Sequence, residues 1–135
     1  MMKVVPATEP LVLLECLVAG TSHRPNLEKY EPKLKIGQAL QLSREADSKY
    51  DDWAVQVHTA PATDPANVWL GYLPEGRNET VARLLDAGKH LSARLNHKSW
   101  ETDWLHIDIE VLVVAGEKGF AHNNITKMIG YLLLS

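Results

Sequence analysis

The sequence predicts a mainly β domain, a small, curled antiparallel sheet of six strands with one helix between the fourth and fifth strands. Two observations support this prediction. Short runs of alternating or continuous apolar residues recur between segments rich in turn formers, which is typical of β-strands. A single run, residues 78–87, instead repeats its apolar residues every three or four positions, as a helix does. We expect barrel-like closure, because closure hides the edges of such a sheet.

The first strand is expected over residues 11–19, a continuous apolar run that stops at Gly20. The polar residues 20–25 then predict a turn or loop. Residues 26–36 contain Pro32 among charged side chains, so we expect a surface connection with one short helix at most.

The next three strands form a predicted meander. Residues 38–44 and 53–58 alternate polar and apolar side chains with period two, which is typical of half-buried strands. The polar residues 45–52 separate these two strands as a loop. Residues 60–67 contain two prolines and other turn formers, and they predict a long hairpin loop before the apolar strand at 68–73.

The predicted helix has recognisable ends. Asn78 is a suitable amino-terminal cap, and Gly88 provides a carboxy-terminal stop. The apolar side chains that share one face of this helix are Val81, Leu84 and Leu85.

The last two strands are expected at residues 91–95 and 105–114, paired as a hairpin across a polar loop at 96–103. The second of these strands places its odd-numbered apolar residues on one face. Asp108 and Glu110 lie on the opposite face, which we interpret as solvated. Further along, residues 125–134 fit a short helix and a strand almost equally well, and both alternatives stay open.

Length and composition indicate one globular domain, since 135 residues can bury a core without disulfides or a structural metal. We divide the chain into an amino-terminal tail (1–10), the domain (11–114) and a carboxy-terminal extension (115–135). The single cysteine, Cys16, excludes an internal disulfide and fits a reduced cytoplasm. Neither a secretion signal nor an apolar run of about 20 residues is recognised, so we expect a soluble, cytoplasmic protein.

The charge balance restricts the kind of partner. The formal net charge is −3 at pH 7, whereas proteins that hold duplexes through phosphates usually carry a basic excess. Residues 1–50 contain seven Lys or Arg and six Asp or Glu, and residues 51–135 contain seven and eleven. Any anion-binding face must therefore be local and modest.

Three ordered segments carry a family pattern. They are Val18-Ala-Gly-Thr-Ser-His23, Leu42-Ser-Arg-Glu-Ala-Asp-Ser-Lys-Tyr-Asp-Asp-Trp-Ala-Val-Gln-Val57 and Leu70-Gly-Tyr-Leu-Pro74. Together they resemble the HIRAN domain, with its Val-x-Gly, Arg-Glu-Pro-x-Asn-x-Tyr-Asp-x-Asn-Ala and Gly-[Tyr/His]-[Leu/Ile]-Pro segments. The resemblance covers roughly residues 11–114. It fits a stand-alone bacterial member, because no P-loop pattern of a motor is present.

The resemblance implies an OB-like barrel that binds DNA. The best understood members of the family bind single-stranded DNA and recognise a free 3′ end. The resemblance therefore implies a DNA-binding module in a DNA repair or replication-fork context. The resemblance implies neither catalytic residues nor a cofactor in this chain. It implies that a helicase or nuclease is the partner protein and supplies the enzymatic activity.

Carried over by position, the resemblance also implies a nucleic-acid pocket formed by loops around the barrel. Its members are Ser22, His23 and Arg24 from the first loop, Lys49, Tyr50 and Asp51 from the second, Tyr72 before the helix, and Trp100 late in the domain.

The chemistry of these residue types fits the ligand. The rings of Tyr50, Tyr72 or His23 can stack on an exposed base, for about 1 to 3 kcal/mol per base. Arg24, Lys49 or Lys35 can hold the adjoining phosphates. The carboxylate of Asp51 can accept a terminal 3′-hydroxyl, whereas it repels an internal phosphodiester, so we expect end selectivity to depend on Asp51.

Structural interpretations of the same residues stay open. Tyr50 and Asp51 also fit a turn with a packing tyrosine, Tyr72 fits a core or edge aromatic, and Trp53, Trp69 and Trp104 fit core packing. The histidines lack the His-x-His or His-x₃-His spacing of a metal site, and no Gly-x-Ser-x-Gly elbow indicates a nucleophile.

The alternative function is a protein–protein interaction or structural module on the same scaffold. The apolar residues 128–134 motivate it, because such a strip must be buried internally or against a neighbour. That neighbour could be a second copy of the chain, so the tail could support a homodimer, and the oligomeric state stays undecided.

Overall fold

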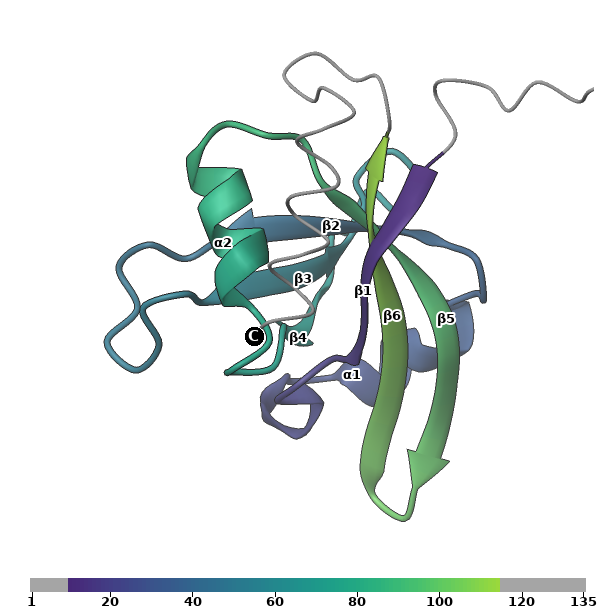
Figure 1. The fold of residues 1–135 in the computed structure, drawn as a ribbon. Coiled ribbons are helices and arrows are strands. Elements are labelled where there is room, and N and C mark those ends of the chain that lie inside the picture. The colour runs from purple at the N-terminus through teal and green to yellow at the C-terminus, as the bar shows by residue number, and fades with distance from the viewer. Residues whose placement is uncertain (1–9, 115–135) are drawn as a thin grey trace, which may run out of the picture.

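Six antiparallel strands form one sheet in the computed structural model, which describes residues 10–114. In chain order they are β1 (Pro10–Leu17), β2 (Ala39–Arg44), β3 (Val55–Thr59), β4 (Trp69–Tyr72), β5 (Ser92–Glu101) and β6 (Trp104–Val114). Their order across the sheet is β1-β6-β5-β2-β3-β4 (Figure 1). The predicted mainly β fold with six antiparallel strands is confirmed.

Helices occupy two connections. Helix α1 (Leu27–Tyr30) lies between β1 and β2, flanked by 3-10 turns at Thr21–His23 and Glu31–Lys33. Helix α2 (Glu79–Asp86) lies between β4 and β5, as predicted, and the left-handed Gly88 (φ +81°) follows its end. The predicted cap needs correction, because Asn78 stands at the N-cap position but its side chain makes no capping bond there.

The sheet curls until the segment after β1 meets β4. Ala19 and Tyr72 exchange two backbone hydrogen bonds, of 2.8 Å from Ala19 N–H and 2.9 Å from Tyr72 N–H. Gly71 makes this approach possible, since a Cβ built on it would lie 2.3 Å from the carbonyl oxygen of Ala19. Closure therefore brings the first and third motif segments into contact.

The core lies on the face that the alternation predicted. Leu40 and Leu42 of β2 are buried, and so are the odd-numbered apolar residues of β6. The connection around α1 is anchored by Leu27 and Leu34, which are both buried. In β2 and in the first part of β6 alternate residues enter this interior, so the side chains between them face outward.

Two features of the last hairpin differ from expectation. The predicted loop at 96–103 is mostly strand, because β5 runs to Glu101 and pairs with β6 up to a turn at Thr102 (φ +64°) and Asp103. This hairpin extends away from the rest of the sheet (Figure 1), and the residues of β5 beyond Leu95 lack the apolar alternation of a core strand. The predicted solvated face is wrong for Glu110, which is buried and accepts a hydrogen bond of 2.7 Å from Nε of Arg94 on β5.

The predicted extension at 115–135 lies outside the described residues, and so do both the helix-or-strand alternative for 125–134 and the interaction role of 128–134. None of the helices between residues 10 and 114 has the length and apolar character that crossing a membrane requires.

Candidate nucleic-acid interface

Arg24 lies over the ring of Trp69, with its guanidinium carbon 3.6 Å from the ring centroid. Arg24 follows a 3-10 turn that is anchored by the hydroxyl of Thr21, which donates a hydrogen bond of 2.7 Å to the carbonyl of Leu105. The other arginines between residues 10 and 114 all donate hydrogen bonds to protein groups, whereas the guanidinium of Arg24 makes only this ring contact. Its N–H donors are therefore available to an external acceptor.

Tyr72 belongs to a polar and aromatic network on the same side of β3 and β4. Its ring meets Trp69 edge to face, with centroids 5.5 Å apart. Its hydroxyl donates a hydrogen bond of 2.9 Å to Oε1 of Glu45, which also accepts one of 2.6 Å from the amide of Gln56. Gln56 Oε1 lies 2.8 Å from Nε2 of His58, and the His58 ring stacks on Trp69. The network thus joins β3, β4 and the start of the β2–β3 loop.

The pKa of Tyr72 reflects these neighbours. Burial raises the pKa above its ordinary value, and the hydrogen bond and charge of Glu45 raise it further, while the charge of Arg24 lowers it. The phenol therefore stays protonated at neutral pH and acts as a donor to Glu45. Glu45 and Tyr72 come from the second and third motif segments, and Arg24 directly follows the first. Closure of the barrel has gathered the three residues at one place.

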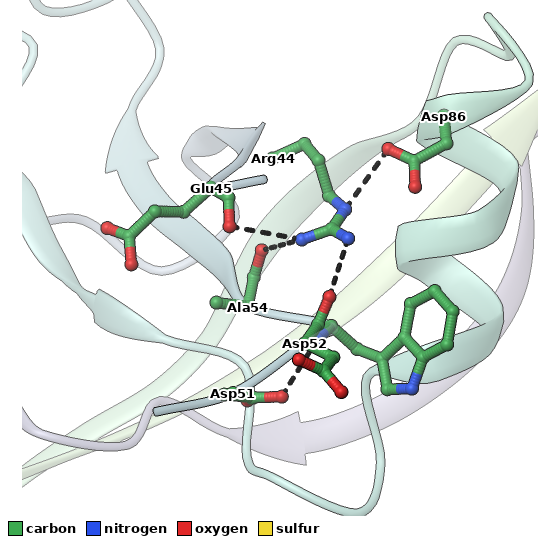
Figure 2. Close-up of polar contacts among 7 residues, drawn as sticks. Arg44, Glu45, Asp51, Asp52, Ala54 and Asp86 are labelled. Carbon is green, nitrogen blue, oxygen red and sulfur yellow. Dashed lines mark hydrogen bonds and ion pairs between the residues drawn. The ribbon is translucent and has the colours of Figure 1, made fainter. Parts of the chain in front are cut away.

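Arg44 organises the β2–β3 loop, residues 45–54 (Figure 2). Its guanidinium donates hydrogen bonds of 3.1 Å to the carbonyl of Glu45, 3.0 Å to that of Ala54 and 2.6 Å to that of Asp52. Its Nε forms an ion pair of 3.1 Å with Asp86 of α2. One side chain thus satisfies three loop carbonyls and ties the loop to the helix.

Tyr50 and Asp51 behave differently within this loop. The carboxylate of Asp51 accepts hydrogen bonds of 2.9 Å from the N–H of Trp53 and 2.7 Å from the amide of Asn78. The hydroxyl of Ser48 lies 3.3 Å from the backbone nitrogens of both Tyr50 and Asp51. Tyr50 itself is 94% exposed. The geometry therefore gives Asp51 a structural task and leaves the Tyr50 ring free.

Besides Asp51, which holds the loop, the predicted site residues fall into three groups. Arg24 and Tyr72 are brought together around Trp69. The side chains that the structure leaves exposed on the nearby loops are Ser22, His23, Lys49 and Tyr50. Trp100 is 44% exposed near the end of β5, on the hairpin that extends away from the β2–β3 loop in Figure 1.

Sequence reasoning missed Glu45 and Trp69. Trp69 was assigned to core packing, but it is half-buried beneath Arg24 while its neighbour Leu70 is fully buried. The alternation with Leu70 was a usable signal, because adjacent strand residues point to opposite faces. Glu45 stands in the second motif, but nothing in the sequence indicates that it reaches Tyr72, 27 residues away.

The arrangement suits binding. It offers a cation without a polar partner, aromatic rings and a carboxylate, and these recognise phosphates, bases and hydroxyls. In the described part of the chain, no three His, Cys, Asp or Glu side chains gather as metal ligands. Burial raises the pKa of the Cys16 thiol to about 11, so this residue is a poor nucleophile at neutral pH.

Comparison with known proteins identifies the family and supports the fold. The family model of the HIRAN domain matches residues 11–115. A structure of a Lactobacillus plantarum protein superposes with a TM-score of 0.68 at 23% identity, covering 79% of this chain and 97% of that one. The HIRAN domain of human HLTF superposes with a TM-score of 0.65 at 12% identity, covering 93% and 91%. A search of curated proteins returned no match.

Proposed function

The chain belongs to the HIRAN domain family, and from this premise we propose that it is a DNA-binding module that holds single-stranded DNA at a free 3′ end. HIRAN domains are known for DNA binding in remodelling and repair contexts. The proposed context is DNA repair or a replication fork in the cytoplasm of a bacterium. The proposed role is binding, and a helicase or nuclease partner supplies the catalysis.

The contact between Arg24 and Trp69 supports this function most directly. A guanidinium pairs well with phosphate because its N–H groups match two phosphate oxygens at once. The Trp69 ring, 3.6 Å below, holds the guanidinium in place before any ligand arrives, so less conformational entropy is lost on binding.

The neighbouring aromatic rings suit the bases of the same strand. Tyr72 lies against Trp69, and the exposed ring of Tyr50 lies in the loop whose first residue, Glu45, bonds to Tyr72. Lys49, next to Tyr50, is exposed and adds a second cation to the half-buried Arg24. A strand that follows these residues places phosphates at the cations and bases on the rings.

The net charge of −3 makes the proposed contact a local one. If Arg24 and Lys49 each neutralise one phosphate, the logarithm of the binding constant falls with the logarithm of salt concentration with a slope of about −1.4 for a single strand. A protein that contacts many phosphates of a duplex shows a much steeper dependence of its binding constant on salt concentration.

Fluorescence anisotropy with short, 5′-labelled single strands tests the proposal. Arg24→Ala should weaken binding about tenfold or more, because a charge-assisted contact is lost. Arg24→Lys should recover only part of the affinity. Lys33→Ala removes an equal charge from the exposed 3-10 turn Glu31–Lys33 and should change little. Equal losses in Arg24→Ala and Lys33→Ala contradict the proposed face, and absence of any binding favours the interaction-module alternative.

A further inference from the structure

Strand β1 is an edge strand, and within residues 10–114 only one of its two sides has a partner strand. That partner is β6, which pairs with β1 along Pro10–Leu17. On the other side, Ala19 closes the barrel just beyond the end of β1, because its N–H and carbonyl both bond to Tyr72. Backbone groups of alternate residues point the same way, so those of Leu17 and Glu15 continue this row along the free side of β1.

This free side is suited to pairing with a further strand. A side-chain contact supports its direction, since Nη2 of Arg77 donates a hydrogen bond of 3.3 Å to the carbonyl of Glu15. The side chains of Leu11, Val12 and Leu17 are 38%, 44% and 38% exposed. An edge strand with exposed apolar side chains is a template for an extended apolar segment, and proteins usually cover such an edge.

Two leucines next to this edge are buried without belonging to the main core. Leu13 of β1 and Leu112 of β6 are each 7% exposed, yet both lie outside the core cluster of the described residues. Leu112 pairs with Val12 on one side and with Ser92 on the other, and both of these neighbours are exposed. The main core therefore does not account for the burial at this end of β1 and β6, which indicates a second apolar layer.

We infer that the free edge of β1 is the docking site of the chain's own apolar segment, residues 128–134, which adds to it as an extended strand. The segment contains no charged residue. The chain continues towards it from Val114, which pairs with Pro10 at the start of β1. The 13 residues 115–127 span up to about 43 Å when extended, whereas the eight residues of β1 extend about 26 Å. The segment can therefore reach every position along the edge.

The tether favours this segment over a second copy of the chain. A short connection gives the attached segment an effective concentration on the order of millimolar at its docking site. A second copy has to reach a similar concentration in solution to compete for the same backbone groups. Docking of the segment thus covers the edge within one molecule and prevents edge-to-edge association.

Amide hydrogen exchange, followed by NMR on the full-length protein, tests the inference. The amides of Glu15 and Leu17 on the free edge should be protected in the wild-type protein. Leu133→Asp places a charge within the docked segment, so these two amides should exchange at least about tenfold faster. Ile36→Asp is the matched control, because Ile36 is 60% exposed on the connection between β1 and β2, and it should leave both rates unchanged.

The amide of Val18 is the internal reference for the fold, since it donates to the carbonyl of Ile107 on β6 at 2.9 Å. If Leu133→Asp also accelerates exchange at Val18, the milder Leu133→Ala replaces it in the comparison. Rapid exchange of Glu15 and Leu17 in the wild-type protein overturns the inference whatever the variants do.

Two further outcomes identify a different occupant and also overturn the inference. If the protection of Glu15 and Leu17 survives substitution of Leu133, another segment covers the edge. If the protection rises with protein concentration and sedimentation shows a dimer, a second copy occupies the edge.

Discussion

The side-chain amide of Asn78 donates a hydrogen bond of 2.7 Å to Oδ2 of Asp51, and this bond joins the start of α2 to the β2–β3 loop. The other oxygen of Asp51 accepts from the N–H of Trp53 at 2.9 Å, which fixes the loop's own turn. The ion pair between Arg44 and Asp86 makes a second link between the same two elements. Helix and loop therefore stabilise each other, and the exposed ring of Tyr50 lies on an ordered support.

We predict that Asp51→Ala lowers the free energy of unfolding by about 1 to 3 kcal/mol, because the partners of both carboxylate oxygens lose their acceptor. Urea denaturation measures this loss. Asn78→Ala should also lower the free energy of unfolding, because it breaks one of the same hydrogen bonds. The double variant Asp51→Ala/Asn78→Ala should therefore lose less than the sum of the two single losses. Asp52→Ala is the matched control, since Asp52 accepts from Arg44 only through its backbone carbonyl. Equal losses for Asp51→Ala and Asp52→Ala contradict the structural role.

The sequence could not predict these links, although it predicted the strands on either side. Alternation in residues such as Leu40 and Leu42 reports burial, and burial follows from local pattern. The partners of Asp51 and Arg44 lie 27 and 42 residues away in the chain, and only the closed sheet decides that they meet. Asn78 shows why sequence alone is ambiguous. An asparagine directly before a helix usually caps it, but here the side chain makes no capping bond and its amide donates to Asp51.

The candidate site was predictable to a similar extent. The motifs identified Arg24, Tyr50 and Tyr72, whose exposed or half-buried positions fit binding. They did not identify Trp69, since a tryptophan within a strand is usually packed in the core. The polar end of β5 was also missed, because its residues beyond Leu95 have no apolar alternation and resemble a loop in sequence.

Gly71→Ala should open the barrel where β4 meets Ala19. The added Cβ would lie 2.3 Å from the carbonyl oxygen of Ala19, so the two segments must separate. Gly76→Ala is the control, because Gly76 also has a positive φ (+86°) but a Cβ there meets nothing within 4 Å. We expect Gly71→Ala to lose about 1 to 3 kcal/mol more than Gly76→Ala in urea denaturation. Hydrogen exchange should show faster opening of the amides of Ala19 and Tyr72, and similar losses in both variants rule out the collision as the cause.

Tyr50→Ala should weaken binding of single-stranded DNA without destabilising the fold. The ring is 94% exposed, so its removal costs little packing, whereas loss of one stacked base costs about 1 to 3 kcal/mol of binding free energy. Tyr50→Phe keeps the stacking ring and should bind nearly as well as the wild-type protein. Anisotropy and urea denaturation on the same samples separate the two effects. Unchanged affinity in Tyr50→Ala removes this ring from the interface.

Tyr72 should make stability depend on pH in the alkaline range. Burial and Glu45 raise its folded-state pKa, while the unfolded chain has the ordinary value of about 10. As pH rises, the unfolded state loses its proton first, so the contribution of Tyr72 is fully present below about pH 10 and is lost as pH rises through the folded-state pKa. Tyr72→Phe should remove this part of the alkaline loss in the free energy of unfolding, and Glu45→Gln should make it smaller. Urea denaturation between about pH 9 and pH 11 measures how the free energy of unfolding changes with pH, and Tyr50→Phe is the control for an exposed tyrosine. If Tyr72→Phe and the wild-type protein lose stability in parallel, Tyr72 does not carry the effect.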